Sequence, residues 1–171
     1  KTMHKSLAPE IARLLGSLKS ALAVRDRAET NRVIEQLLLT RAPLGAQWRR
    51  ISELMRVSGE LTLACRAMDA FIQAQGNSAQ ARYAKVVLLT QSGRQREAHD
   101  LLATLPINVP DHAGRAYVLG NIAMTLGRVD EARDHLVTAL KHRPGWGPAW
   151  LTLATTVNLV TDPLGDKMLA D

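Results

Sequence analysis

The residues that could support catalysis or metal binding are few, and they lie far apart in this chain of 171 residues. A zinc protease places two histidines on one helix face in the pattern H-E-x-x-H, and this pattern does not occur. Glu131 and His135 stand four residues apart, which is an ordinary contact on a helix surface. We therefore predict no catalytic residue, no cofactor and no metal. The five histidines are His4, His99, His112, His135 and His142.

Cys65 is the only cysteine, so the sequence offers no internal disulfide and no cluster of thiolates for a metal ion. We expect this cysteine to be a small buried residue beside Ala64. Glycine-rich phosphate-binding loops and the G-x-S-x-G turn of serine hydrolases are also absent from the sequence. These residues therefore favour a non-enzymatic role for this stretch of chain, and they leave the activity of a longer protein open.

Basic residues outnumber acidic ones, 22 to 16, which gives a net charge of +6. A basic protein can bind nucleic acid or an acidic partner. The arginines are scattered, however, without a Lys/Arg run and without interleaved aromatic residues. This pattern favours a solvated outer surface, and nucleic-acid binding stays the weaker alternative.

The elements that would position any site are clearest in the segment 113–144, which has the pattern of two helices joined by a tight turn. Ala116, Gly120 and Ala123 fall on one apolar helical stripe. Gly127 then allows a turn conformation that most other residues avoid. Small residues at Gly120 and Ala132 would let the two helices approach closely. Leu119 belongs to the first helix. The second helix has Asp130 and Glu131 in its first turn and Leu136 and Ala139 on its inner face, and Pro144 ends it.

This hairpin recurs at steps of 34 residues along the chain. The turn glycine Gly127 is preceded at that step by Gly93 and Gly59. The same register contains a second set, Ala132, Ala98 and Ala64, and a third set, Trp48, Arg82, Ala116 and Trp150. A fixed period of this size is typical of helical repeat proteins, in which each hairpin buries its apolar face against its neighbours.

The residues of this period resemble the tetratricopeptide repeat (TPR) family. The resemblance implies an all-α, right-handed α-α superhelix, a solenoid of helix hairpins. It departs from the family pattern at Phe71, Val86 and Leu105, where small residues are usual, and at Arg25 and Thr30, which replace the turn glycine and the alanine. We predict a single TPR-like domain over 1–171, with repeats at 11–44, 45–78, 79–112 and 113–146 and a partial repeat at 147–171.

We expect the first repeat to begin after a polar lead-in at 1–8 and to continue through helices ending at Ala23 and Leu39, the second capped by Asp26. Later pairs are predicted at 45–57 with 60–74, 79–92 with 94–104, and 112–126 with 129–142. A last long helix at 146–159 and a closing helix at 164–170 complete the prediction.

The C-terminal stretch is similar to the junction in bacterial proteins that join such repeats to a sulfotransferase domain. Ala149-Trp150, then Asp162-Pro163-Leu164 and Met168-Leu169, match that junction. The resemblance implies an alternative function, in which the chain is the accessory N-terminal region of a sulfotransferase whose catalytic domain lies after Asp171. The apolar residues of 164–170 would then be covered by that domain, or by a second copy of the chain in a homodimer.

In a TPR solenoid the first helix of each pair lines the concave face, where a protein or extended peptide binds. Tyr83 and Tyr117 occupy equivalent places one repeat apart and offer stacking area, so we predict a peptide-binding scaffold. A clamp of Lys, Asn and Arg for a C-terminal carboxylate is not matched. The alternative is that these residues form only the solvated side of amphipathic helices. The predicted contact residues are Arg49, Glu53, Arg56, Tyr83, Val87, Thr90, Tyr117, Asn121, Thr155 and Asn158, with Met124, Thr125 and Leu151 beside them.

No stretch of about 18 residues is free of charge, so we expect no membrane span. With one cysteine and no visible secretory signal, the cytoplasm is the expected compartment.

Overall fold

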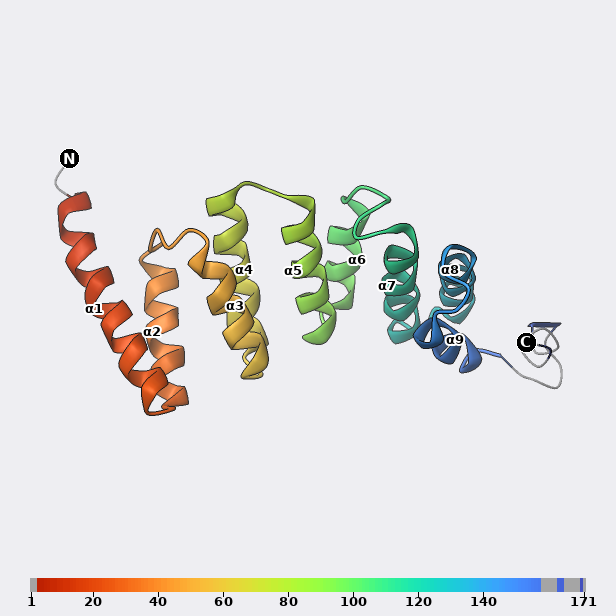
Figure 1. Ribbon diagram of the computed structural model, residues 1–171, viewed down its shortest axis with the longest axis horizontal. Coiled ribbons are helices and arrows are strands. Elements are labelled where there is room, and N and C mark those ends of the chain that lie inside the picture. The colour runs from red at the N-terminus through yellow and green to blue at the C-terminus, as the bar shows by residue number, and fades with distance from the viewer. Residues whose placement is uncertain (1–2, 158–162, 165–169, 171) are drawn as a thin grey trace. The chain divides into compact units, whose positions relative to one another are not determined.

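Every element of secondary structure in the described part of the chain is an α-helix, which confirms the all-α prediction (Figure 1). The computed structural model describes the backbone of residues 3–157, 163–164 and 170, and their side chains from residue 8 onward. The helices are α1 (Met3–Ala23), α2 (Arg27–Leu39), α3 (Gln47–Val57), α4 (Leu61–Gln75), α5 (Ala79–Gln91), α6 (Gln95–Ala103), α7 (His112–Thr125), α8 (Val129–His142) and α9 (Gly147–Ala154).

The turn inside each hairpin explains why the helices pair. Gly127 has a φ of 74°, in the left-handed region that favours glycine. Its amide donates to the carbonyl of Met124 at 3.0 Å, and the amide of Arg128 donates to the carbonyl of Ala123 at 2.9 Å. These two bonds form a Schellman motif, which satisfies the last carbonyls of α7 and reverses the chain.

The first hairpin makes the same turn without a glycine. Arg25 has a φ of 56°, and the amide of Asp26 donates to the carbonyl of Ala21 at 2.9 Å. The Asp26 carboxylate then accepts from the amide of Glu29 at 3.0 Å, which confirms the predicted N-cap of α2. The repeat therefore fixes the turn geometry even where the sequence lacks its usual residue.

Arg25→Gly is expected to raise the free energy of unfolding by about 0.5–1 kcal/mol. A left-handed non-glycine residue costs roughly 1–2 kcal/mol, partly offset by the larger entropy of glycine in the unfolded chain. Urea denaturation of the variant measures the gain. Arg25→Ala is the matched control, because alanine keeps the Cβ atom that causes the strain. An equal gain from both variants would show that the arginine charge, and not the backbone, is responsible.

Small residues lie where the helices of a hairpin cross, as predicted. A Cβ atom added to Gly120 would lie 2.9 Å from Cγ of Leu136 and 3.4 Å from the carbonyl oxygen of Ala132. At the equivalent place between α3 and α4, the buried hydroxyl of Ser52 donates to the carbonyl of Ala64 at 2.8 Å. Both contacts require a small residue on the first helix.

The chain divides into two compact units, Lys1–Ser92 and Gly93–Asp171. The first contains α1 to α5, and the second contains α6 to α9. The division falls inside the predicted third repeat, between its two helices. The prediction of one domain over 1–171 stays a prediction, and the units are described separately below.

Residues 3–8 were expected to be a polar lead-in, and this expectation is wrong, because α1 begins at Met3. Met, Lys, Leu and Ala in this stretch are good helix formers. Pro9 removes one backbone hydrogen bond but does not outweigh that preference.

The helix predicted over 146–159 is also too long, because α9 ends at Ala154. The hydroxyls of Thr155 and Thr156 donate to the carbonyls of Thr152 and Leu153 at 2.6 and 2.7 Å. Such local bonds compete with the helical backbone pattern. Residues 158–159 and most of the predicted closing helix at 164–170 lie outside the described residues.

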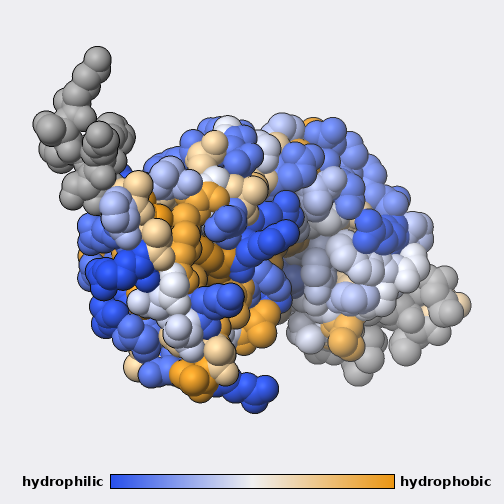
Figure 2. All heavy atoms as spheres, turned by 60° about the vertical axis from the view of Figure 1, so that its left-hand side comes forward, coloured by the Kyte–Doolittle hydropathy of each residue, from blue (hydrophilic) through white to orange (hydrophobic). Residues whose placement is uncertain are grey.

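Hydrophilic residues cover much of the visible surface of the first unit, with a band of hydrophobic residues among them (Figure 2). Its exposed large hydrophobic residues are Leu22, Val24, Leu39 and Val57. Among the described helices, none combines the length and hydropathy needed to cross a membrane.

Candidate functional site

A groove of about 530 Å³ lies between α3 and α5 in the first unit. It gathers Arg49, Glu53 and Arg56 from α3 with Tyr83 and Val87 from α5, all of which the sequence predicts as contact residues. These positions come together because both helices are the first helices of consecutive hairpins. The remaining lining residues are Ser52, Met68, Gln80, Ala84 and Leu88.

The groove has an apolar floor. Met68 of α4 and Leu88 of α5 are almost fully buried there, at 6% and 4% exposure. The hydroxyl of Ser52 adds little polarity, because it already donates to a backbone carbonyl. Apolar side chains of a ligand would therefore be buried against this floor, while polar groups would meet the rim.

Charged groups form the rim on the α3 side. Arg56 donates two hydrogen bonds to the Glu53 carboxylate, at 2.8 and 2.6 Å, in a bidentate ion pair. The guanidinium of Arg49 lies over the ring of Phe71, 5.9 Å from its centroid. This cation–π contact holds Arg49 against α4. Phe71 is the bulky residue that departs from the repeat pattern, so the departure positions a rim residue.

The hydrogen bonds from Arg56 hold the pKa of the Glu53 carboxyl below its ordinary value. The Arg56 pKa is raised by the same bonds. Because the folded-state pKa of Glu53 is depressed, the ion pair stabilises the fold at pH values above the unfolded-state pKa of this carboxyl group. That contribution is lost as the pH falls through the folded-state value. The rim therefore keeps both charges at neutral pH.

Arg56→Gln is expected to return the pKa of Glu53 toward its ordinary value. The variant removes the guanidinium whose hydrogen bonds favour the charged carboxylate. A pH titration followed by NMR at the Glu53 carboxyl carbon measures the change. Arg32→Gln is the control, since Arg32 pairs with Glu29 on α2. A Glu53 pKa unchanged by Arg56→Gln would contradict the ion pair in solution.

Thr90 was predicted with these residues but does not line the groove. Its hydroxyl donates to the carbonyl of Val87 at 2.7 Å, one turn back on α5. The side chain is half-buried and part of the helix surface. Two of the lining residues outside the prediction, Gln80 and Ala84, lie on the same stripe of α5 as Val87 at helical spacing. That helical spacing is a sequence signal from which both residues could be predicted.

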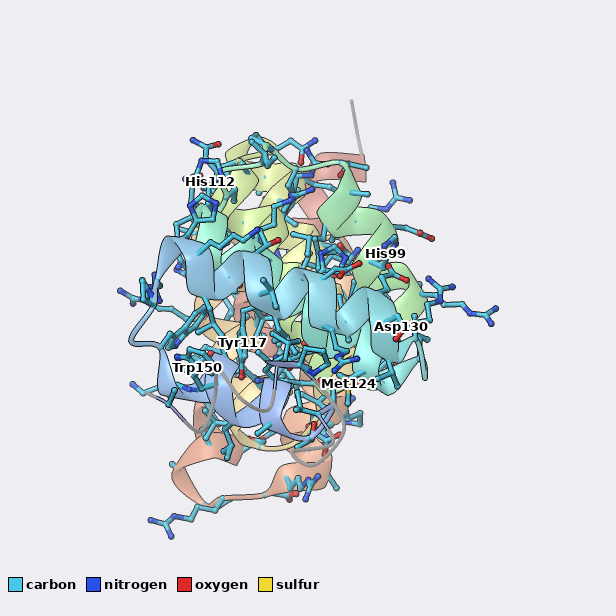
Figure 3. The ribbon with its side chains drawn as sticks, turned by 90° about the vertical axis from the view of Figure 1, so that its right-hand side faces the viewer. His99, His112, Tyr117, Met124, Asp130 and Trp150 are labelled. Atoms are coloured by element: carbon cyan, nitrogen blue, oxygen red, sulfur yellow. The ribbon has the colours of Figure 1, made fainter. Side chains whose placement is uncertain are left out.

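In the second unit, Tyr117 packs into an apolar cluster instead of standing free. Its ring lies 4.6 Å from that of Trp146, and both pack with Trp150 against the core of α8 and α9. Figure 3 shows Tyr117 and Trp150 near each other beside α9. Arg143 covers Trp146 at 4.4 Å and also bonds Asp111 at 3.3 Å. Tyr117 is therefore largely a packing residue in this unit.

The other predicted residues of the second unit are more scattered. Asn121 is half-buried on α7, and its carbonyl accepts from the hydroxyl of Thr125 at 3.0 Å. Thr155 is exposed just after α9, while Asn158 lies outside the described residues. Their role in binding stays a prediction.

The histidines in the described part of the chain form pairs and no larger cluster with other groups able to bind a metal. Figure 3 shows His99 and His112 on opposite sides of the view. His112 instead stacks on His142, with ring centroids 5.1 Å apart, and His135 lies 3.7 Å from Glu131 as expected of a surface pair. Cys65 is buried, as predicted. In the described part of the chain, no group of three or more His, Cys, Asp or Glu is placed to hold a metal.

Helix hairpins with a left-handed turn residue every 34 positions, two of them with a small residue at the crossing, give the fold of a TPR-like helical repeat protein. The fold is similar to that of MamA, a TPR-containing protein, in two solved structures. A MamA RS-1 double mutant matches with a TM-score of 0.65, at 14% identity over 94% of this chain and 90% of that one. MamA from Desulfovibrio magneticus RS-1, residues 41 to the end, matches with a TM-score of 0.63, at 14% identity over 94% and 89%.

No protein-family model and no curated protein sequence matches the chain. At 14% identity, the two solved structures show the fold alone. Nothing in these comparisons points to a sulfotransferase, and that association stays a prediction. Of the residues on which it rests, Asp162, Met168 and Leu169 lie outside the described residues.

Proposed function

We propose that the chain is a protein-binding scaffold that holds an extended segment of a partner in the groove between α3 and α5. The observation behind the proposal is that five predicted contact residues line one groove with a buried apolar floor. A TPR-like fold is compatible with this role, because its first helices present non-core side chains to a ligand.

The chemistry of the groove suits an extended peptide. A peptide in this conformation points alternate side chains to opposite sides. Apolar side chains on one side would lie over Met68 and Leu88, and polar groups would meet the rim. Tyr83 offers a ring for packing, and Arg49 is a hydrogen-bond donor that its contact with Phe71 already orients. Such aromatic and arginine side chains commonly dominate binding energy at protein interfaces.

The test is a selection of peptides from a random displayed library on the unaltered chain, followed by calorimetry on the enriched sequences. Combining Arg49→Ala with Tyr83→Ala should weaken their binding at least about tenfold, which corresponds to roughly 1.4 kcal/mol. The control combines Arg13→Ala with Arg50→Ala, two exposed residues outside the groove. Failure to enrich any sequence, or equal binding by the groove variant, would reject the proposal.

A further inference from the structure

A second pocket, of about 520 Å³, lies between the second helices α2 and α4 of the first unit. It is separate from the groove between α3 and α5, because the two share no lining residue. Buried Trp48 and Ala42 lie at its base, and α4 contributes one wall. The residues that decide its chemistry are Arg41, Arg66, Asp69, Ala70, Gln73 and Ala74.

The pocket exists because α4 carries alanines at two surface positions one turn apart. Ala70 and Ala74 line it. At the same repeat positions the first hairpin has Gln36 and Thr40, and the fourth has Thr138 and His142. Larger side chains at these places would fill the space above Trp48. The pair of alanines is therefore particular to the second repeat.

One cation at this pocket is not neutralised within the described chain. Arg66 bonds Glu35 at 3.1 Å, and Asp69 pairs with Lys85 at 2.6 Å. Arg41 is exposed, and among the described residues no carboxylate forms an ion pair with it. Its backbone has a φ of 50°, a left-handed conformation that is costly for arginine. This conformation belongs to the Schellman motif that ends α2, in which the amides of Arg41 and Ala42 donate to the carbonyls of Leu38 and Leu37 at 3.1 and 3.0 Å. The exposed guanidinium, unpaired within the described residues, makes Arg41 the candidate for contact with a ligand.

The charge of the chain is concentrated in the unit that contains this pocket. Residues 1–92 include 14 Lys and Arg against 7 Asp and Glu, a net charge of +7. Residues 93–171 include 8 against 9, a net charge of −1. An acidic partner would therefore be attracted to the first unit.

We propose that the pocket between α2 and α4 binds an acidic segment of a partner protein. A carboxylate of that segment pairs with the Arg41 guanidinium, and a neighbouring apolar side chain fills the space beside Ala70 and Ala74. This site is independent of the groove between α3 and α5. Trp48 is 3% exposed and presents no face for base stacking, so a protein segment fits better than nucleic acid.

The experiment uses the full chain and a short fluorescein-labelled peptide of alternating Glu and Leu, with binding followed by anisotropy. The peptide should bind saturably, and its Lys–Leu counterpart should not. Arg41→Ala should weaken binding at least about tenfold, as expected for loss of a charge-assisted hydrogen bond. Combining Ala70→Gln with Ala74→Thr copies the first repeat and fills the pocket, and it should weaken binding without changing the net charge.

Two variants separate this site from its alternatives. Arg13→Ala removes the same charge from α1 and should leave the affinity unchanged, as should Arg49→Ala in the groove. The proposal would be overturned if the acidic peptide did not bind saturably, or if the Arg41→Ala chain bound it equally well. Loss of binding in Arg13→Ala would show an effect of net charge alone, and loss in Arg49→Ala would place the segment in the groove. Arg41-dependent binding of an oligothymidine, without peptide binding, would favour nucleic acid.

Discussion

Gly120→Leu is expected to lower the free energy of unfolding of the second unit by about 3 kcal/mol, the upper part of the range for overpacked cores. The first atom of any side chain at this position would lie 2.9 Å from Leu136, which is fully buried. The carbonyl oxygen of Ala132 lies close behind, so α8 itself would have to move away from α7. The variant therefore tests the close helix contact on which the hairpin depends.

Hydrogen exchange measured by mass spectrometry can locate this effect. Peptides from α7 and α8 should lose protection in the Gly120→Leu chain. Gly16→Ala is the matched control, because a Cβ atom at Gly16 meets nothing within 4 Å and alanine is the better helix former. That variant should be neutral or stabilising. Unchanged protection of α7 and α8 in Gly120→Leu would mean that the helices do not cross at this residue.

Trp48→Ala is expected to destabilise the first unit by about 3–5 kcal/mol, the usual cost of removing a large buried aromatic side chain. Trp48 is 3% exposed, and its indole donates to the carbonyl of Ala42 at 3.1 Å. Trp150 repeats this contact in the second unit, where its indole donates to the carbonyl of Pro144 at 2.6 Å. In both cases the tryptophan fixes the link between hairpins to the helix that follows.

Urea denaturation of three variants separates packing from hydrogen bonding. Trp48→Phe keeps much of the volume and removes only the indole hydrogen bond, because the Ala42 carbonyl still accepts from the amide of Leu44 at 2.8 Å. Its cost should therefore be about 0.5–1.5 kcal/mol. Trp150→Ala should cost less than Trp48→Ala, because Trp150 is only half-buried. Equal costs for Trp48→Ala and Trp48→Phe would show that the hydrogen bond, and not the buried ring, is the main contribution.

The sequence predicts the helix pairs well, because a 34-residue period constrains the turn, the crossing and the apolar stripe at once. Gly127 and Gly120 illustrate this, since each has the role that its position in the repeat predicts. The groove between α3 and α5 follows for the same reason. Its residues occupy matching places on the first helices of consecutive repeats.

Features that break the repeat could not be predicted in this way. Arg41 adopts a left-handed backbone conformation outside the register of the turn glycines, which its residue type does not suggest. The pocket between α2 and α4 depends on two alanines. In the sequence alone, these alanines look like ordinary helix-surface residues. Tyr117 matches Tyr83 in register, yet Trp146 from the next link packs on its ring. Such contacts depend on which residues are neighbours in three dimensions, and the 34-residue period does not determine them.

The proposed scaffold function is tested most directly by locating a bound peptide on the chain. A photo-crosslinking amino acid introduced at Val87 in the groove, and separately at the exposed Val24 outside it, would be irradiated with a library-selected peptide. We expect a covalent adduct from position 87 that excess unlabelled peptide suppresses, and none from position 24. A specific adduct from position 24, with none from position 87, would contradict the proposed function.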